Sequence, residues 1–238
     1  MDMEIQTKQT PEDVARALAE QMVEWSREGH LRHIALSGGS TPRLLFDILA
    51  AEYRHKLPWE QLVFYWGDER CVPPDHDQSN YGMTRERLLD PLGIDGSRVH
   101  RIRGEAEPER EARRYAGILQ EQLPQPSGIP RFDLVLLGLG TDGHTASIFP
   151  HEAALWDAEA FCEIATHPES GQKRITLTGQ VINQAARVVF LVTGQSKAKR
   201  VREILEDSAA AASYPAARVA PSDGKLIWML DQAAAGQR

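Results

Sequence analysis

The stretch Leu136-Leu137-Gly138-Leu139-Gly140-Thr141-Asp142-Gly143-His144 decides the fold, because it runs from an apolar segment directly into a glycine-rich turn. Glycine lets the backbone approach a ligand closely and adopt positive φ. In open α/β sheets, ligands bind beyond the carboxyl ends of the strands. A histidine more often has a structural role, but His144 follows Asp142 in a polar turn of this kind. The stretch therefore predicts a strand whose end presents an acid/base pair.

Short apolar runs on both sides of this stretch predict further buried strands. The expected strands are residues 34–36, 62–66, 99–102, 134–137, 188–192 and 226–230. Amphipathic segments between them predict helices over residues 11–29, 42–53, 81–89, 108–123 and 196–205. This alternation predicts an α/β fold, a single-domain, Rossmann-like three-layer sandwich with a mostly parallel central sheet flanked by helices. We expect residues 1–238 to form that one domain.

Composition excludes several classes of protein. The chain has a net charge of −7 and no basic tract with interleaved aromatic residues, so we expect no nucleic-acid partner. No segment approaches the roughly 18 consecutive apolar residues that span a bilayer, so we expect no membrane partner. Cys71 and Cys162 are the only cysteines and form no disulfide framework. These features favour a cytoplasmic protein, and we expect a monomer or a weak homo-oligomer.

A second glycine-rich turn follows the expected strand at residues 34–36. It consists of Ser37, Gly38, Gly39, Ser40 and Thr41, and Pro42 then suits the first position of a helix. Backbone N–H groups, hydroxyls and the positive end of a helix can converge there on a phosphate. No lysine completes a Walker motif, which disfavours a nucleotide triphosphate. An ordinary capped helix start is the alternative interpretation.

Charged residues follow two other expected strands. Lys197 stands near the start of a helix, where it opposes the helix dipole, and this favours an anionic ligand. Asp68, Glu69 and Arg70 follow the strand at residues 62–66. Charges at one strand end usually meet only solvent, but a parallel sheet brings such ends together. His76 lies between two aspartates, yet adjacent ligands on a loop are weak support for a metal site, and we expect no metal.

Together these motifs resemble the 6-phosphogluconolactonases, within the larger family of glucosamine-6-phosphate deaminases and related sugar-phosphate isomerases. The resemblance covers most of the chain and rests on residues 37–42, 67–70, 79–81, 138–144 and 193–198, in the family's order. It implies hydrolysis of 6-phospho-D-glucono-1,5-lactone to 6-phospho-D-gluconate in the oxidative pentose phosphate pathway. The expected partner is a small-molecule sugar phosphate, and the resemblance implies no cofactor.

The resemblance also implies roles for individual residues. His144 would take a proton from the attacking water and return it to the ring oxygen, and Asp142 would orient His144. Arg70 would stabilise charge on the carbonyl oxygen. The substrate and its 6-phosphate would be bound by Ser37, Gly38, Gly39, Ser40, Thr41, Asp68, Asn80, Arg174 and Lys197.

The nearest alternative is a deaminase or ketose-aldose isomerase of the same group. Deaminases resemble Asp-Glu-Tyr after the second strand and carry a glutamate five residues beyond the motif histidine. Here the corresponding residues are Arg70 and Phe149, and a phenylalanine cannot transfer protons.

Two alternatives come from other classes. Residues 138–143 satisfy the dinucleotide fingerprint of a dehydrogenase, and Glu163 lies 20 residues beyond Gly143. However, Pro150 follows seven residues after Gly143 and leaves too little room for the crossover helix. The second alternative, a noncatalytic sugar-phosphate sensor, would not need the pair of Asp142 and His144.

Overall fold

Two sheets organise the computed structural model, which describes residues 2–236. The larger has six strands in the order β1-β9-β8-β5-β2-β3, all of them paired in parallel. Its strands are β1 (Asp2–Lys8), β2 (His33–Leu36), β3 (Val63–Trp66), β5 (Leu134–Leu137), β8 (Arg187–Val192) and β9 (Lys225–Asp231). A smaller antiparallel sheet contains, in order, β4 (Asp68–Arg70), β7 (Lys173–Leu177) and β6 (Cys162–Thr166). The predicted α/β fold with a mostly parallel central sheet is confirmed.

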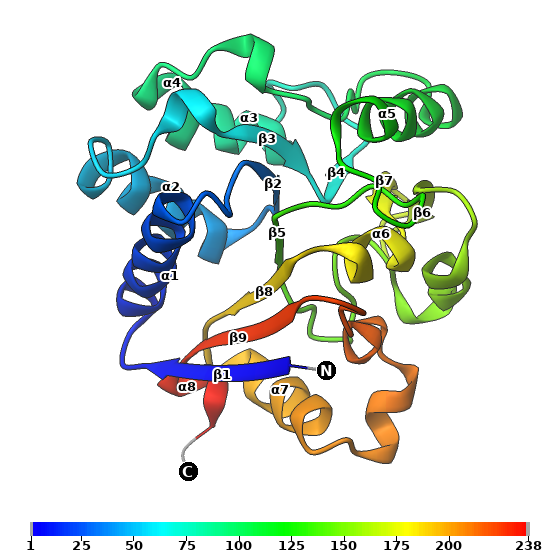
Figure 1. The fold of residues 1–238 in the computed structure, drawn as a ribbon. Helices are drawn as coiled ribbons and strands as arrows, with labels where there is room; N and C mark the ends of the chain where they lie inside the picture. The colour runs from blue at the N-terminus through cyan, green and yellow to red at the C-terminus, as the bar shows by residue number, and fades with distance from the viewer. Residues whose placement is uncertain (1, 237–238) are drawn as a thin grey trace.

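Helices cover both faces of the larger sheet (Figure 1). Right-handed connections place α1 (Pro11–Arg27) and α2 (Ser40–Glu52) on one face, and α5 (Pro108–Gln122), α6 (Gly179–Gln184) and α7 (Ala198–Leu205) on the other. Shorter helices are α3 (Asn80–Thr84), which continues into a π-helical turn (Arg85–Leu89) and α4 (Asp90–Leu92), and α8 (Gln232–Ala235). The 3₁₀ turns are Trp59–Gln61, Gly96–Arg98, Pro150–Asp157, Gln195–Lys197, Ala209–Ser213 and Pro215–Arg218.

Local sequence explains where these elements lie. All four residues of β3 and of β5 are buried, as expected for apolar strands in a parallel sheet that is covered on both faces. Helix α1 begins with a capping box, in which Thr10 and Asp13 each accept a hydrogen bond from the other's backbone N–H. Pro11 occupies its first turn, and Gly29, with φ of 74°, follows its end.

The order of strands creates a switch point between β2 and β5. The chain leaves β2 through α2 toward β3 on one side, and leaves β5 toward β8 on the other. The two turns that follow these neighbouring strands therefore diverge to opposite faces of the sheet. Crevices of this kind, at the carboxyl ends of parallel strands, are where α/β proteins bind ligands.

The structure differs from the sequence prediction in several elements. The strand expected at residues 99–102 is wrong, because only a single bridge joins Val99 to Phe64 and the segment has no other strand pairing. Strand β1 was not predicted, since its alternating polar residues lack an apolar run. The three-stranded sheet was also not predicted, because β4 has only three residues and all of them are charged. Within residues 2–236, no helix combines the length and apolar character needed to cross a membrane.

Candidate active site

A cavity of about 250 Å³ lies at the switch point, over the carboxyl ends of β2 and β5. Eight of the predicted site residues line it, namely Ser37, Gly38, Asp68, Arg70, Asn80, His144, Arg174 and Lys197. These residues come from segments that lie far apart in the sequence. The other four predicted residues, Gly39, Ser40, Thr41 and Asp142, do not line this cavity. Gly39 directly follows the lining residue Gly38, and Ser40 and Thr41 come next in the chain. Asp142 contacts the lining residue His144, and Thr41 contacts Thr193 in the turn that carries Lys197.

The turn after β5 holds the predicted acid/base pair. Nδ1 of His144 lies 2.6 Å from Oδ1 of Asp142, which also accepts a hydrogen bond of 3.1 Å from the His144 backbone N–H. With Nδ1–H directed at the carboxylate, Nε2 is the ring nitrogen left for a ligand. Burial disfavours the charged form of Asp142, but the hydrogen bonds and charge of His144 outweigh it and lower the pKa of Asp142 to about 2.

Gly140 makes this pairing possible. A Cβ at Gly140 would collide with Nδ1 of His144 and Oδ1 of Asp142. The backbone N–H of Gly140 donates a 2.8 Å hydrogen bond to the His144 carbonyl, which closes the turn. On its other side, the His144 ring packs at 4.8 Å, centroid to centroid, against the fully buried ring of Phe149. The imidazole is therefore held by a carboxylate on one side and by an apolar ring on the other.

Two arginines from the smaller sheet face the same cavity. Arg70 on β4 is directly opposite Arg174 on β7 in the antiparallel register. Nη1 of Arg70 donates to the Gln78 carbonyl at 2.6 Å. The guanidinium of Arg174 lies 5.5 Å from the centroid of the Phe149 ring. The buried Nε atoms of both arginines have no hydrogen-bond partner within residues 2–236, and both residues line the cavity.

Asp68 and Ser147 complete this wall of the cavity. Asp68 is 5% exposed, and its Oδ2 accepts a 2.6 Å hydrogen bond from the Ser147 hydroxyl. The Asp68 carbonyl accepts a hydrogen bond from the Asn80 side chain at 2.9 Å. A Cβ at Gly38 would overlap the Asn80 side chain, so Gly38 allows the turn after β2 to lie against α3. The sequence did not identify Ser147, because a serine two residues beyond Thr145 in a turn carries no distinctive pattern.

Glu69 is the functional-site residue that sequence reasoning most clearly missed. It is 2% exposed, and its carboxylate accepts hydrogen bonds from the Ser79 hydroxyl and from three backbone N–H groups, those of Arg70, Asn80 and Tyr81. Burial raises the pKa of Glu69, although the backbone N–H groups oppose that effect. Glu69 thereby ties β4 to the start of α3. Its position in a run of three charged residues was the only available signal.

The turn after β2 suits an anion at its backbone. Gly39 is the N-cap of α2 with φ of 105°, and no side chain caps this helix. The first N–H groups of α2 are therefore free to meet an anion. The Thr41 hydroxyl lies 2.8 Å from the Thr193 hydroxyl, which joins this turn to the turn that carries Lys197. Burial lowers the pKa of Lys197 and the nearby charge of Asp142 opposes this, and Lys197 forms no ion pair within residues 2–236.

The alternatives from the sequence can be compared with this geometry. Residues 141–149 form turns, and a 3₁₀ helix begins at Pro150, so no crossover helix follows the glycine-rich stretch as a dinucleotide site requires. Nδ1 of His76 accepts a hydrogen bond from the Gln78 N–H on an exposed loop. In the described part of the chain, no three His, Cys, Asp or Glu side chains are arranged to hold a metal ion.

Fold and site together define a doubly wound α/β protein with a histidine–aspartate pair in a cationic cleft. The chain belongs to the family of glucosamine-6-phosphate isomerases and 6-phosphogluconolactonases, whose model matches residues 6–228. A 6-phosphogluconolactonase of Haemophilus influenzae is 45% identical over 226 residues, 94% of this chain and 95% of that protein. One of Treponema pallidum is 50% identical over 174 residues, 73% of this chain and 72% of that protein. The solved 6-phosphogluconolactonase of Trypanosoma brucei superposes with a TM-score of 0.83 at 33% identity, over 98% of both chains.

Proposed function

We propose that this protein hydrolyses 6-phospho-D-glucono-1,5-lactone to 6-phospho-D-gluconate, the lactonase step of the oxidative pentose phosphate pathway. The observation that carries the proposal is the 2.6 Å contact between His144 and Asp142 in a cleft shared with Arg70 and Arg174. The names and high identity of the relatives from Haemophilus influenzae and Treponema pallidum support lactone hydrolysis. We further propose that residues 1–238 act as one lactonase domain.

His144 acts as general base and then as general acid. Its Nε2 takes a proton from water as the water oxygen attacks the C1 carbonyl carbon. Asp142 holds Nδ1–H and stabilises the imidazolium that forms, and its depressed pKa keeps it ionised for that task. When the bond between C1 and the ring oxygen breaks, Nε2 returns its proton to that oxygen. Water supplies the atoms of the new acid, so the step balances without another reactant.

Charge stabilisation comes from the smaller sheet. Negative charge develops on the C1 carbonyl oxygen in the tetrahedral intermediate, and Arg70 is the donor that we assign to it. Losing a donor of this type typically costs about 100- to 1,000-fold in rate. The position of Arg70 in the lining of the same cavity as His144 supports this assignment.

Phosphate binding is assigned to the turn after β2 and to two cations. Ser37, Gly38, Gly39, Ser40 and Thr41 present hydroxyl and backbone groups at the N-terminus of α2, and Lys197 and Arg174 add positive charge. Asp68 and Asn80, which also line the cavity, contact the hydroxyl groups of the sugar. In this proposal the ligand is a small sugar phosphate.

The alternative within the family is a deaminase or sugar-phosphate isomerase. The residue five positions beyond His144 is Phe149, which is fully buried and packs on the imidazole. No proton-transferring group stands there, and this favours the lactonase.

The decisive experiment follows formation of 6-phospho-D-gluconate from freshly generated lactone, measured against spontaneous hydrolysis without protein. Acceleration proportional to protein concentration establishes the activity. No acceleration over the blank rejects it. Release of ammonia from glucosamine 6-phosphate would instead identify a deaminase, and binding of sugar phosphates with neither reaction would identify a sensor.

A further inference from the structure

Strand β1 is the outer edge of the six-stranded sheet and pairs only with β9. None of its seven residues is buried, whereas every residue of β9 except the first is. Met3 and Ile5 are 43% and 48% exposed, and no other large hydrophobic side chain of residues 2–236 is exposed. An edge strand presents unpaired backbone N–H and C=O groups, which bind readily to another strand. A single exposed apolar residue is ordinary, but two on one face of an open edge mark a surface that can pair.

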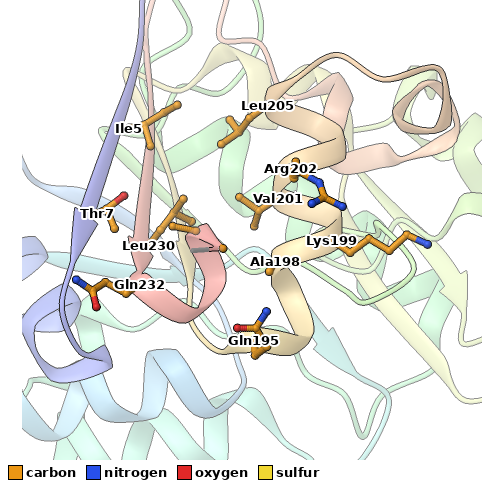
Figure 2. Close-up of a pocket in the computed structure, with 12 residues that line it drawn as sticks. Ile5, Thr7, Gln195, Ala198, Lys199, Val201, Arg202, Leu205, Leu230 and Gln232 are labelled. Carbon is orange, nitrogen blue, oxygen red and sulfur yellow. The ribbon is translucent and has the colours of Figure 1, made fainter. Parts of the chain in front are cut away.

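The face that carries these side chains borders an open groove (Figure 2). The groove has a volume of about 700 Å³ and lies between β1, α7 and α8, away from the candidate active site. Ile5 and Thr7 line it from β1, and Leu205 lines it from α7. Successive residues of a strand alternate between its faces, so Met3 shares the face of Ile5 and Thr7. This side of β1 is therefore uncovered along the strand.

We propose that β1 pairs with β1 of a second copy of this chain, antiparallel about a two-fold axis at Ile5. The sequence of the strand, Asp2-Met3-Glu4-Ile5-Gln6-Thr7-Lys8, is complementary to itself in this orientation. Ile5 lies opposite Ile5 of the second copy, and Met3 lies opposite Thr7. Asp2 at one end lies opposite Lys8 at the other, and the two-fold axis creates this ion pair twice. One sheet then continues through both copies.

The charges of β1 favour antiparallel pairing about Ile5 over parallel pairing and over a shifted register. Parallel pairing would place Asp2 against Asp2 and Lys8 against Lys8, and like charges directly opposite are destabilising. A shift of one residue would set Glu4 opposite Ile5 and would lose the match of faces. Within residues 2–236, neither Asp2 nor Lys8 has an ion-pair partner, while Glu4 is already paired with Lys225 of β9. The two end charges are thus free to pair with a second copy.

Sedimentation velocity of the full chain, from about 1 µM to 1 mM, tests the association. We expect a concentration-dependent dimer. Asp2→Lys sets two lysines against each other at both ends and should weaken dimerisation about tenfold. The double variant Asp2→Lys/Lys8→Asp restores opposite charges and should return the affinity to within about threefold of the original. Glu60→Lys, an exposed site elsewhere with the same change of charge, should have no effect.

Disulfide cross-linking tests the register. Cα atoms of directly opposed residues lie about 4.5–5.5 Å apart, within the range of a disulfide. Ile5→Cys should therefore form a covalent dimer on mild oxidation. Thr7→Cys should not, because two copies of that position lie about 13 Å apart, but a mixture of Met3→Cys and Thr7→Cys proteins should cross-link. A monomer at every concentration, an affinity unchanged by Asp2→Lys, or no rescue by the double variant overturns the proposal. Binding of β1 to a strand of a different protein, with no self-association, overturns it equally.

Discussion

Arg70 and Arg174 stand directly opposite each other on adjacent antiparallel strands, and the buried Nε of each has no hydrogen-bond partner within residues 2–236. Like charges opposite one another destabilise a sheet, and a buried donor without a partner costs about 1–3 kcal/mol. Negatively charged groups of a ligand at the two guanidinium groups would offset the repulsion between them. The pair is therefore better suited to a ligand than to the stability of the fold.

Removing one of these arginines tests that inference. Arg174→Ala should bind 6-phospho-D-gluconate about tenfold more weakly, because one charge-assisted contact is lost. The ligand-free protein should unfold at a nearly unchanged temperature, since relief of the repulsion by Arg70 is offset by loss of the attraction to Asp68. Thermal unfolding with and without ligand measures both effects, and Arg113→Ala on α5 is the exposed control. A lower ligand-free midpoint together with unchanged binding would show that Arg174 is structural.

His144→Ala and Lys197→Ala should separate turnover from binding. The first removes the acid/base group and should lower kcat by about 100- to 10,000-fold while 6-phospho-D-gluconate still binds. The second removes a cation from the phosphate region and should mainly raise KM. Steady-state kinetics and calorimetric titration distinguish the two profiles. Equal loss of binding in both variants would contradict the roles assigned to these residues.

Gly140→Ala should inactivate the protein although it adds only a methyl group. Its Cβ would overlap the paired atoms of His144 and Asp142, so the two side chains must separate. We expect kcat to fall at least about tenfold, because misplaced general bases lose efficiency. Gly117→Ala in α5 is the control, because it adds the same methyl group away from the cavity and its Cβ would meet no atom within 4 Å. Similar activity in the two variants would mean that Gly140 does not protect the histidine–aspartate contact.

Glu69→Gln should disorder the wall of the cavity at a distance from the reacting atoms. The amide offers one acceptor oxygen where the carboxylate oxygens accept four hydrogen bonds, and its NH₂ group meets N–H donors. We expect a stability loss of about 1–3 kcal/mol together with a fall in kcat/KM. Ser79→Ala removes one of these four donors together with the hydrogen bond that the Ser79 hydroxyl accepts from the Gly82 N–H, and it should have a smaller effect on kcat/KM. Denaturant unfolding and kinetics provide the comparison, and full activity in Glu69→Gln would contradict a positioning role.

The depressed pKa of Asp142 sets the expected pH dependence. The folded-state pKa is about 2 against an ordinary value of 3.8, so the stability supplied by the carboxylate is present above about pH 4 and is lost as pH falls toward 2. Asp142 should therefore not titrate in the pH–rate profile between about pH 5 and 8. Asp142→Asn removes the carboxylate, so kcat should fall and the loss of stability between about pH 4 and pH 2 should become smaller. An unchanged loss of stability over this range would show that the Asp142 carboxylate does not cause it.

The parts of the fold that sequence predicted are those with strong local patterns. Strand β5 is apolar throughout, β8 is apolar after its first residue, and α1 has a capping box. The edge strand β1 and the charged strand β4 lack such patterns, because pairing with β9 and β7 defines them. Residues 99–102 begin and end with an apolar residue, but His100 and Arg101 lie between them, and the segment makes a single bridge at the edge of the sheet.

The candidate site was predictable where residues follow strand ends in glycine-rich turns, as His144 and Lys197 do. The turns alone did not indicate that Glu69 would be buried and would accept four hydrogen bonds, since burial depends on the packing of α3 against β4. The opposition of Arg70 and Arg174 depends on a register between segments about a hundred residues apart, which no local pattern encodes.

The smaller sheet has a consequence for how new reactions could arise on this scaffold. Apart from Arg174, the residues assigned to phosphate binding and to proton transfer follow strands of the larger sheet, whereas Asp68, Arg70 and Arg174 lie on β4 and β7. The sequence of the smaller antiparallel sheet can thus change while the turns that follow the larger sheet stay the same. Sequence change confined to the smaller sheet would alter which charges face the reacting carbon, and a library restricted to these strands would explore new chemistry without rebuilding the rest of the pocket.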